Sequence, residues 1–287
     1  MNAGDFELGD RTVRRLGFGA MQLTGPGVLG SPADRAEAIA VLRRAVELGV
    51  DHIDTAQYYG PDVANELIRA ALYPYPPELA LVSKVGEVRD DRGGWVPALR
   101  PEQLRAGVLA NLRSLSVEQL AAVNLRLPDP ADDHQGVGFD EQLDAMIAMR
   151  DEGLIGGVGL SNVPLDRLVQ ATERTEIVCV QNAFNVVDRT SEPVLWACAR
   201  HAIAFVAFYP LGSAVDGVNP VLAHPGVIAA ATRFGATPAQ VALAWCLAFA
   251  PNILLIPGTR SVSHLQENMA AGSVRLDDAA LASLESA

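Results

Sequence analysis

Short apolar runs alternate with longer amphipathic stretches along almost the whole chain. Eight of these runs are rich in aliphatic residues and are bounded by turn-forming residues, a pattern that is typical of buried strands. The predicted strands are Leu16–Ala20, His52–Asp54, Leu79–Lys84, Ala121–Arg126, Ile155–Leu160, Ile177–Gln181, Ile203–Phe208 and Ile253–Ile256.

Between the strands, apolar residues recur at the spacing of one helix face. Ser31 and Thr237 each precede a proline, as a capping residue does before a first helical turn. Gly49 and Gly153 follow predicted helix ends, where a left-handed residue is favoured. The predicted helices are Ala33–Leu48, Asp62–Leu72, Pro101–Leu115, Phe139–Glu152, Pro164–Thr172, Pro193–His201, His224–Phe234 and Thr237–Leu247, with a last one near Asp277–Glu285.

Eight strand–helix alternations without a linker or low-complexity segment predict an α/β fold, one (β/α)8 TIM barrel in a single domain over residues 1–287. Two doubly wound domains are the alternative, although no change of composition marks a boundary. The segment Asp5–Arg14, with Gly9-Asp10 between two short alternating runs, predicts an N-terminal β-hairpin. Catalytic residues of such barrels come from the carboxyl ends of the strands, so the ends of the runs are the places to search.

Composition narrows the class of protein. The chain has 287 residues, 49% apolar and 20% charged, which allows a sizeable core. Its 22 basic and 34 acidic side chains give a net charge of −12, which argues against a nucleic-acid partner and predicts repulsion from anionic membranes. Cys179, Cys198 and Cys246 lack zinc-site spacing and predict buried free thiols. The N-terminus lacks signal-peptide order, and no apolar stretch is long enough to span a bilayer, so we expect a cytoplasmic protein without membrane contact.

Three polar residues stand at the ends of the second and third predicted strands. Asp54 ends the second strand, Lys84 ends the third, and Tyr59 follows Asp54 closely. Because an isolated buried charge is costly, Asp54 and Lys84 are expected to pair, and that pair alone is compatible with a purely structural role. An ammonium favours the phenolate of a nearby tyrosine, so Tyr59 is a candidate proton donor to a developing alkoxide near neutral pH. Tyr58 is expected to be structural.

These residues carry a resemblance to a known family. The stretches GVDHIDTAQYYG at 49–60 and LVSKV at 81–85 resemble the catalytic motifs of the aldo-keto reductases, in their bacterial form, and the similarity extends over residues 16–268. It implies that Tyr59 is the general acid, that Lys84 lowers its pKa, and that Asp54 holds Lys84. It further implies reduction of a small-molecule aldehyde or ketone by a nicotinamide cofactor without a metal, in a protein whose commonest state in the family is a monomer.

One position departs from the family pattern. Where the fourth strand usually has a histidine, this chain has Arg126, in the stretch NLRLPD at 124–129. Arginine is permanently charged and only donates hydrogen bonds, so it can orient a carbonyl oxygen or bind a substrate carboxylate, and it should also favour tyrosinate. The departure leaves open a nicotinamide-binding sensor with little turnover. A Schiff-base lyase using Lys84 is a further alternative, although Asp54 would keep Lys84 protonated.

The cofactor site is expected near the last strands of the barrel. GFGAMQ at 17–22 lacks the third glycine of the dinucleotide fingerprint, and GGVG at 156–159 lies in a strand-like segment, so a Rossmann site is disfavoured. TIM barrels hold phosphates near strands seven and eight. By the family resemblance, Thr259 and Arg260 bind a 2′-phosphate, Glu267 and Asn268 contact adenine, and NADPH is preferred to NADH. His264 stands where many members have arginine.

The resemblance also assigns a nicotinamide pocket. Ser161, Asn162 and Gln181 hydrogen-bond the carboxamide, and Phe208 stacks on the ring. Trp95, after the third strand, is expected to form a wall of the substrate cleft, and the acidic loop 129–133 is expected to be solvated rather than to bind a metal. The remaining implied cofactor contacts are Gly19, Ala20, Met21, Tyr209, Pro210, Leu211, Ser213, Ile256 and Gly258.

Overall fold

The computed structural model describes residues 3–128, 136–213 and 218–285. Its largest sheet has eight parallel strands in the order of the sequence. Leu16 bridges Leu255 in parallel, Gly17 N donates to Leu255 O at 2.8 Å, and Leu255 N donates to Arg15 O at 2.8 Å. These bonds join the first strand to the last and close the sheet into the predicted barrel. The strands are β3 (Phe18–Gly19), β4 (His52–Asp54), β5 (Ala80–Val85), β8 (Ala122–Arg126), β9 (Val158–Ser161), β10 (Cys179–Ala183), β11 (Ala204–Phe208) and β12 (Ile253–Leu255).

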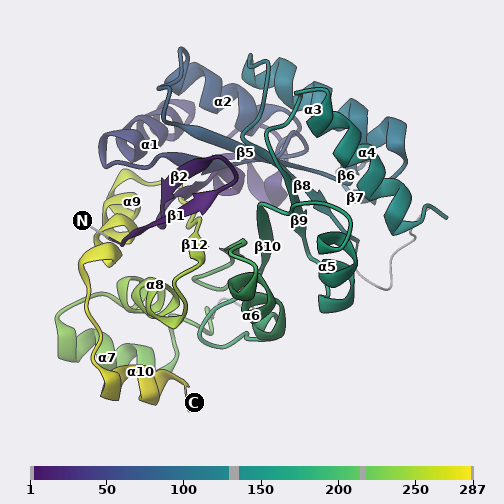
Figure 1. Cartoon of the computed structure of the whole chain (residues 1–287). Helices are drawn as coiled ribbons and strands as arrows, with labels where there is room; N and C mark the ends of the chain where they lie inside the picture. The colour runs from purple at the N-terminus through teal and green to yellow at the C-terminus, as the bar shows by residue number, and fades with distance from the viewer. Residues whose placement is uncertain (1–2, 129–135, 214–217, 286–287) are drawn as a thin grey trace.

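Helices surround the barrel (Figure 1). They are α1 (Arg35–Glu47), α2 (Val63–Leu72), α3 (Pro101–Leu115), α4 (Phe139–Asp151), α5 (Leu165–Thr172), α6 (Glu192–Arg200), α7 (Pro225–Phe234), α8 (Pro238–Phe249), α9 (Val262–Ala270) and α10 (Asp278–Glu285). Thr237 caps α8 by accepting a hydrogen bond from Gln240 N, as predicted. The prediction for Ser31 is wrong, because α1 begins later and is capped by Asp34, which accepts from Glu37 N.

Two antiparallel hairpins accompany the barrel. The predicted N-terminal hairpin pairs β1 (Asp5–Leu8) with β2 (Arg11–Arg14) and lies across one end of the barrel (Figure 1). The second hairpin was not predicted; it pairs β6 (Glu87–Arg89) with β7 (Trp95–Pro97), directly after β5.

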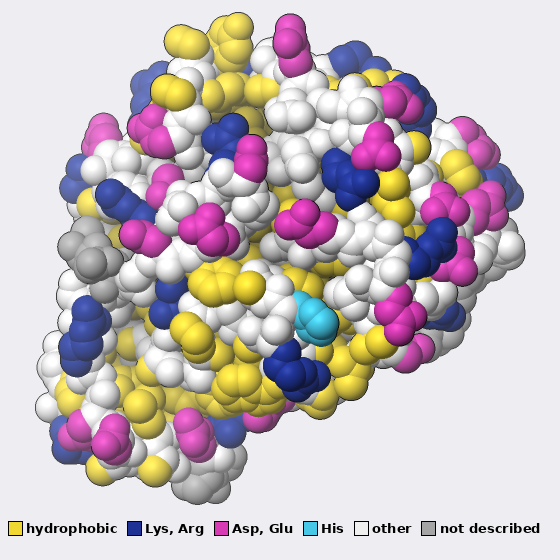
Figure 2. Space-filling view, in the orientation of Figure 1, with side chains coloured by type: hydrophobic (Ala, Val, Ile, Leu, Met, Phe, Trp, Pro, Cys, Tyr) yellow, Lys and Arg dark blue, Asp and Glu magenta, His cyan; other side chains and the backbone are white. Residues whose placement is uncertain are grey.

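Figure 2 shows acidic and basic side chains interspersed over the face seen in this orientation, so this face presents no extended basic surface for a polyanion.

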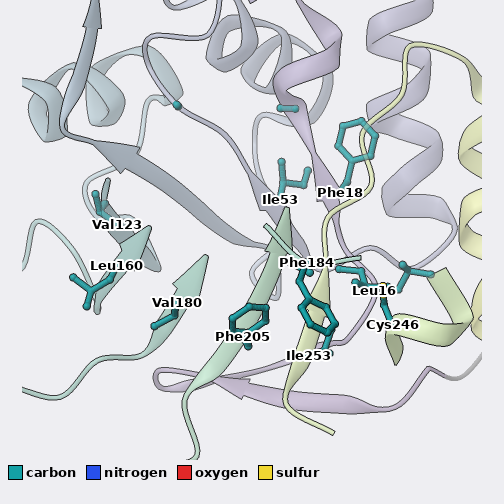
Figure 3. Close-up of a cluster of buried hydrophobic side chains, with 14 of the residues drawn as sticks. Leu16, Phe18, Ile53, Val123, Leu160, Val180, Phe184, Phe205, Cys246 and Ile253 are labelled. Carbon is teal, nitrogen blue, oxygen red and sulfur yellow. The ribbon is translucent and has the colours of Figure 1, made fainter. Parts of the chain in front are cut away.

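The core has an outer and an inner part. The outward faces of the strands pack with helix side chains, and Figure 3 shows Val123, Leu160, Val180 and Phe205 from the successive strands β8 to β11 in this layer. The inner cluster contains strand residues together with hairpin residues, and no helix residue. The inner cluster consists of Leu8, Val13, Ala80, Val82, Ala122, Val178, Cys179, Ala204, Val206, Leu254 and Ile256.

Side chains alternate between the two faces of each strand, so the inward-facing positions continue as far as the carboxyl ends of the strands. Lys84 follows Ala80 and Val82 on the same face of β5, and its register partner on β8 is Asn124. Gly159 leaves room for this interior, since a Cβ there would lie 2.3 Å from Asn124 Oδ1 and 2.7 Å from Cys179 Sγ. Polar side chains therefore converge above an apolar floor.

Within the described ranges, no helix combines the length and apolar character needed to cross a membrane. The acidic loop 129–133, which the sequence assigns to solvent, lies outside the described residues. The three cysteines are free and buried, as predicted.

Candidate active site

A cavity of about 610 Å³ opens at the carboxyl ends of the barrel strands. Asp54, Tyr59, Lys84 and Arg126 all line it. The first, third and fourth come from β4, β5 and β8, and Tyr59 comes from the loop after β4. The structure thus brings the four residues predicted for catalysis to one place.

Asp54 and Lys84 form a buried ion pair through Asp54 Oδ1. Lys84 Nζ also donates to the carbonyl oxygen of Thr55 at 3.0 Å, and Gln181 Nε2 donates to Asp54 Oδ2 at 2.8 Å. Burial opposes the charge of Lys84, but Asp54 and Tyr59 outweigh it, so the pKa of Lys84 is raised. The lysine is therefore held as an ammonium, and the carboxylate is bonded on both oxygens.

Tyr59 lies beside this ammonium. Lys84 Nζ is 5.1 Å from the centre of the Tyr59 ring, and the tyrosine is only 7% exposed. Burial raises the pKa of Tyr59 above its ordinary value, and the Lys84 ammonium offsets only part of this rise. The expected effect of Lys84 is present, but the expectation of a net lowering is wrong because burial dominates. Tyr59 is therefore protonated at neutral pH.

Arg126 has an acidic partner that the sequence did not predict. Its Nε lies 3.1 Å from Oε1 of Glu87, and the two side chains are 26% and 14% exposed. Gly86, which precedes Glu87, has φ of +113°, and a Cβ there would lie 2.4 Å from the carbonyl oxygen of Arg126. Only glycine allows this close approach. Arg126 does lower the pKa of Tyr59, as expected, but it is the smallest of the influences on that group, consistent with a charge paired to Glu87.

The hairpin β6–β7 forms one wall of the cavity. Trp95, predicted as a cleft wall, lines it and is 44% exposed. The Arg89 guanidinium stacks 3.2 Å from the Trp95 ring centre. Tyr58 packs edge-on against both Tyr59 and Trp95, which agrees with a structural role. Tyr58 also lines the cavity, however, and its buried hydroxyl has no hydrogen-bond partner among the described residues.

Half of the predicted cofactor residues line the same cavity. They are Gly19, Met21, Gln181, Phe208, Tyr209, Pro210, Leu211, Ile256 and Gly258. Gly19 and Gly258 make a close backbone contact, because a Cβ on Gly258 would lie 2.5 Å from Gly19 O. Ala20 is buried, Ser213 is exposed, and neither lines the cavity.

Ser161 ends β9 and is the register partner of Gln181, and Asn162 follows it. The Ser161 hydroxyl is buried and has no partner among the described side chains. Asn162 adopts a left-handed conformation with φ of +55°, and its Nδ2 donates to Leu127 O at 3.1 Å. Gln181 already bonds Asp54, so Ser161 has the clearest unused hydrogen-bonding capacity of the three.

The predicted phosphate residues lie at the start of α9, outside the cavity wall. Thr259 is buried and its hydroxyl accepts from Ser261 N at 3.1 Å, whereas Arg260 and His264 are exposed. Glu37 of α1 accepts a hydrogen bond from Val262 N at 3.1 Å, so a carboxylate already binds one of the backbone amides at the N-terminus of α9.

The two residues predicted to contact adenine lie further along α9. Glu267 accepts a hydrogen bond from the hydroxyl of Thr237, the cap of α8. Asn268 is buried. Neither lines the cavity.

Several cavity residues were missed by sequence reasoning. They are Gln22, Gly27, Val28, Glu87, Gly212 and Pro257, besides Tyr58. A signal for Glu87 was present: alternating residues flank Gly93-Gly94, which is a hairpin pattern. For the described residues, no cluster of three or more His, Cys, Asp or Glu side chains is arranged to hold a metal ion.

Comparison with known proteins agrees with this geometry. The aldo/keto reductase family matches residues 15–217 and 227–287. Pyridoxine 4-dehydrogenase of Escherichia coli is 46% identical over 287 residues, covering 99% of this chain and 98% of that protein. An uncharacterised oxidoreductase of Schizosaccharomyces pombe is 41% identical, covering 99% and 89%. An aldo/keto reductase from Klebsiella pneumoniae, solved with NADP and acetate, has a TM-score of 0.82 at 26% identity, covering 100% and 95%. The chain therefore belongs to the aldo/keto reductase family and is an NAD(P)H-dependent oxidoreductase.

Proposed function

We propose that this protein reduces an aldehyde or ketone with NADPH in the cavity of the barrel, with Tyr59 as the general acid. The observation that carries the proposal is a buried Tyr59 phenol beside an ammonium whose counter-ion is Asp54. When bound, the cofactor would supply a hydride to the carbonyl carbon. Tyr59 then delivers the proton that the developing alkoxide oxygen needs, and Lys84 stabilises the phenolate that remains.

The state of Lys84 separates this reaction from Schiff-base chemistry. An amine must be unprotonated to attack a carbonyl, and the pKa of Lys84 is raised by Asp54 and Tyr59 despite its burial. Its ammonium is also bonded to Thr55 O. The lysine is therefore a positioning and electrostatic group rather than a nucleophile.

The residues present fit a nicotinamide dinucleotide. The Ser161 hydroxyl at the end of β9, which has no partner among the described residues, offers a donor to the carboxamide, and Phe208 at the end of β11 offers an aromatic face. Arg260 and Thr259 would hold the 2′-phosphate, with Glu267 and Asn268 at the adenine. Related structures solved with NADP and with NADPH support NADPH as the cofactor.

For the substrate, we propose an aromatic aldehyde and its primary alcohol, with pyridoxal and pyridoxine as the specific pair. The 46% identical relative over the full length is named a pyridoxine 4-dehydrogenase. The cavity also offers aromatic walls from Tyr58, Trp95 and Phe208, which suit a flat heteroaromatic ring. The direction of the reaction depends on the ratio of the reduced to the oxidised cofactor.

The test is NADPH oxidation with pyridoxal, compared between the natural protein and Tyr59→Phe. We expect turnover in the first and a loss of at least 100-fold in the second, with NADPH binding, followed by fluorescence, kept in both. NADPH binding without turnover of pyridoxal or of any other aldehyde or ketone would favour the sensor. Absence of NADPH binding would reject both functions.

We further propose that the chain works as a monomer, as one functional domain, in the cytoplasm. Size-exclusion chromatography with light scattering tests the monomer, and fractionation of cells tests the location.

A further inference from the structure

We propose that the Arg126–Glu87 pair makes the enzyme selective for carbonyl compounds that carry a second oxygen on the carbon next but one to the carbonyl carbon, so that the two oxygens lie side by side and the guanidinium binds both. The inference rests on the proposed reduction at Tyr59 and concerns which substrates that site prefers. An ortho-hydroxy aromatic aldehyde is the representative class, and pyridoxal belongs to it because its hydroxyl neighbours its aldehyde.

The first argument is the shape of the donor. Glu87 engages Nε of Arg126 at 3.1 Å, and the guanidinium carries four further N–H groups on its two terminal nitrogens. These groups form a planar fork that fits two adjacent oxygen atoms better than one. Arg126 is a quarter exposed and lines the same cavity as Tyr59, so its guanidinium borders the space in which the carbonyl must lie.

The second argument is charge. A lone carbonyl oxygen is neutral and repays only part of the hydration that a guanidinium loses on binding it. A hydroxyl beside an aldehyde becomes an anion when it ionises, and an adjacent cation favours that form. The ionised oxygen no longer donates its hydrogen to the neighbouring carbonyl, so both oxygens are free to accept from the fork.

The third argument is the role of Glu87 as a positioning residue. Its carboxylate holds Arg126 from the hairpin β6–β7, and Gly86 allows that hairpin to touch the backbone of Arg126. The same carboxylate pairs with the guanidinium, and Arg126 is the smallest of the influences on the pKa of Tyr59, which burial keeps above its ordinary value. A selective cation and a working proton donor can therefore share one cavity.

Tyr58 completes the subsite. Tyr58 lines the cavity, and its buried hydroxyl has no partner among the described residues. A buried hydroxyl without a partner costs free energy, and a second substrate oxygen held by Arg126 would satisfy it.

The test compares 2-hydroxybenzaldehyde with its isomer 4-hydroxybenzaldehyde, which has the same ring and hydroxyl but no adjacent oxygen pair. In the natural protein kcat/KM should favour the 2-hydroxy isomer by about tenfold, the size of one good charge-assisted bond. Arg126→Gln should reduce the ratio to within threefold of unity, and Arg126→Lys should lose most of it because an ammonium is not a fork. The control is Arg105→Gln, an exposed Arg–Glu pair with Glu152 on the outside of the barrel, which should leave the ratio unchanged.

Glu87→Gln separates positioning from a merely structural role. It should lower the isomer ratio partly and also move the alkaline limb of the reduction profile to lower pH, because an unbalanced guanidinium favours tyrosinate. A ratio near one in the natural protein, or a ratio that survives Arg126→Gln, would overturn the inference while leaving the proposed reductase intact.

If no aldehyde is reduced, the proposed function fails, and binding still tests the inference. Quenching of tryptophan fluorescence by the two isomers should show tighter binding of the 2-hydroxy compound to the natural protein but not to Arg126→Gln. Equal affinity of the isomers for the natural protein overturns the inference.

Discussion

Gln181 Nε2 donates a 2.8 Å hydrogen bond to Oδ2 of Asp54, the carboxylate whose other oxygen binds Lys84. The two donors reach Asp54 from β10 and β5, so the carboxylate is fixed by two separate strands. With both oxygens engaged, Asp54 is held between Gln181 and the Lys84 ammonium.

Removing that carboxylate charge should destabilise the protein. In Asp54→Asn the Lys84 ammonium stays in place without its counter-ion, and breaking a buried pair in this way costs about 3–5 kcal/mol. Urea unfolding followed by circular dichroism measures the loss. The control is the double variant Asp54→Asn/Lys84→Met, which removes both charges and should recover much of the stability without recovering turnover. An Asp54→Asn protein as stable as the natural one would contradict this account of the pair.

The pH profile of reduction should reflect a tyrosine with a raised pKa. The proton donor is the protonated form, and burial holds the pKa of Tyr59 above its ordinary value despite Lys84. Hence kcat/KM for reduction should be level through neutral pH and fall only above about 10, the usual value for tyrosine. In Lys84→Met the alkaline limb of the remaining activity should move to still higher pH, because the group that lowers the pKa of Tyr59 is gone. A limb near pH 7 in the natural protein would show that another group titrates.

Trp95 should contribute to substrate affinity more than to cofactor affinity. It forms the hairpin side of the cavity, packed between the Tyr58 ring and the Arg89 guanidinium. Because an aromatic contact of this kind is worth about 0.5–1.5 kcal/mol, Trp95→Ala should raise KM for the carbonyl roughly three- to tenfold. The Kd of NADPH should stay within twofold. Trp196→Ala, which removes a half-exposed tryptophan of α6, is the matched control and should change neither constant.

The barrel itself could be predicted because its pattern is repeated eight times. Each strand carries the same apolar signal, and helix ends carry local markers such as Thr237 and Gly49, whose roles the structure confirms. The start of α1 could not be placed from Ser31-Pro32, since the competing cap Asp34 satisfies the first turn instead. Cap choice is decided by which side chain reaches the free amide, and sequence spacing alone leaves several candidates.

The cavity could be predicted only where residues are tied to strand ends. Asp54, Lys84 and Arg126 follow from the barrel topology. The place of Glu87 in the cavity could not be predicted in this way. It depends on a tertiary contact with Arg126, which two strands and the turn at Gly86 create. The pKa of Tyr59 was misjudged for a related reason: the sequence shows the nearby charge of Lys84 but does not show how completely the phenol is buried.

Glu37 should weaken the preference for NADPH over NADH. Its carboxylate accepts from Val262 N at the start of α9, beside Thr259 and Arg260, which we propose to bind the 2′-phosphate. A negative charge near that phosphate opposes it, and charges at helix termini are worth about 0.3–1 kcal/mol. Glu37→Gln should therefore tighten NADPH binding by about two- to fivefold while leaving NADH nearly unchanged, as measured by fluorescence titration of both cofactors. Glu102→Gln, in the exposed first turn of α3, is the matched control. Equal tightening of both cofactors in Glu37→Gln would mean that the carboxylate acts on the fold of α9 rather than on the phosphate.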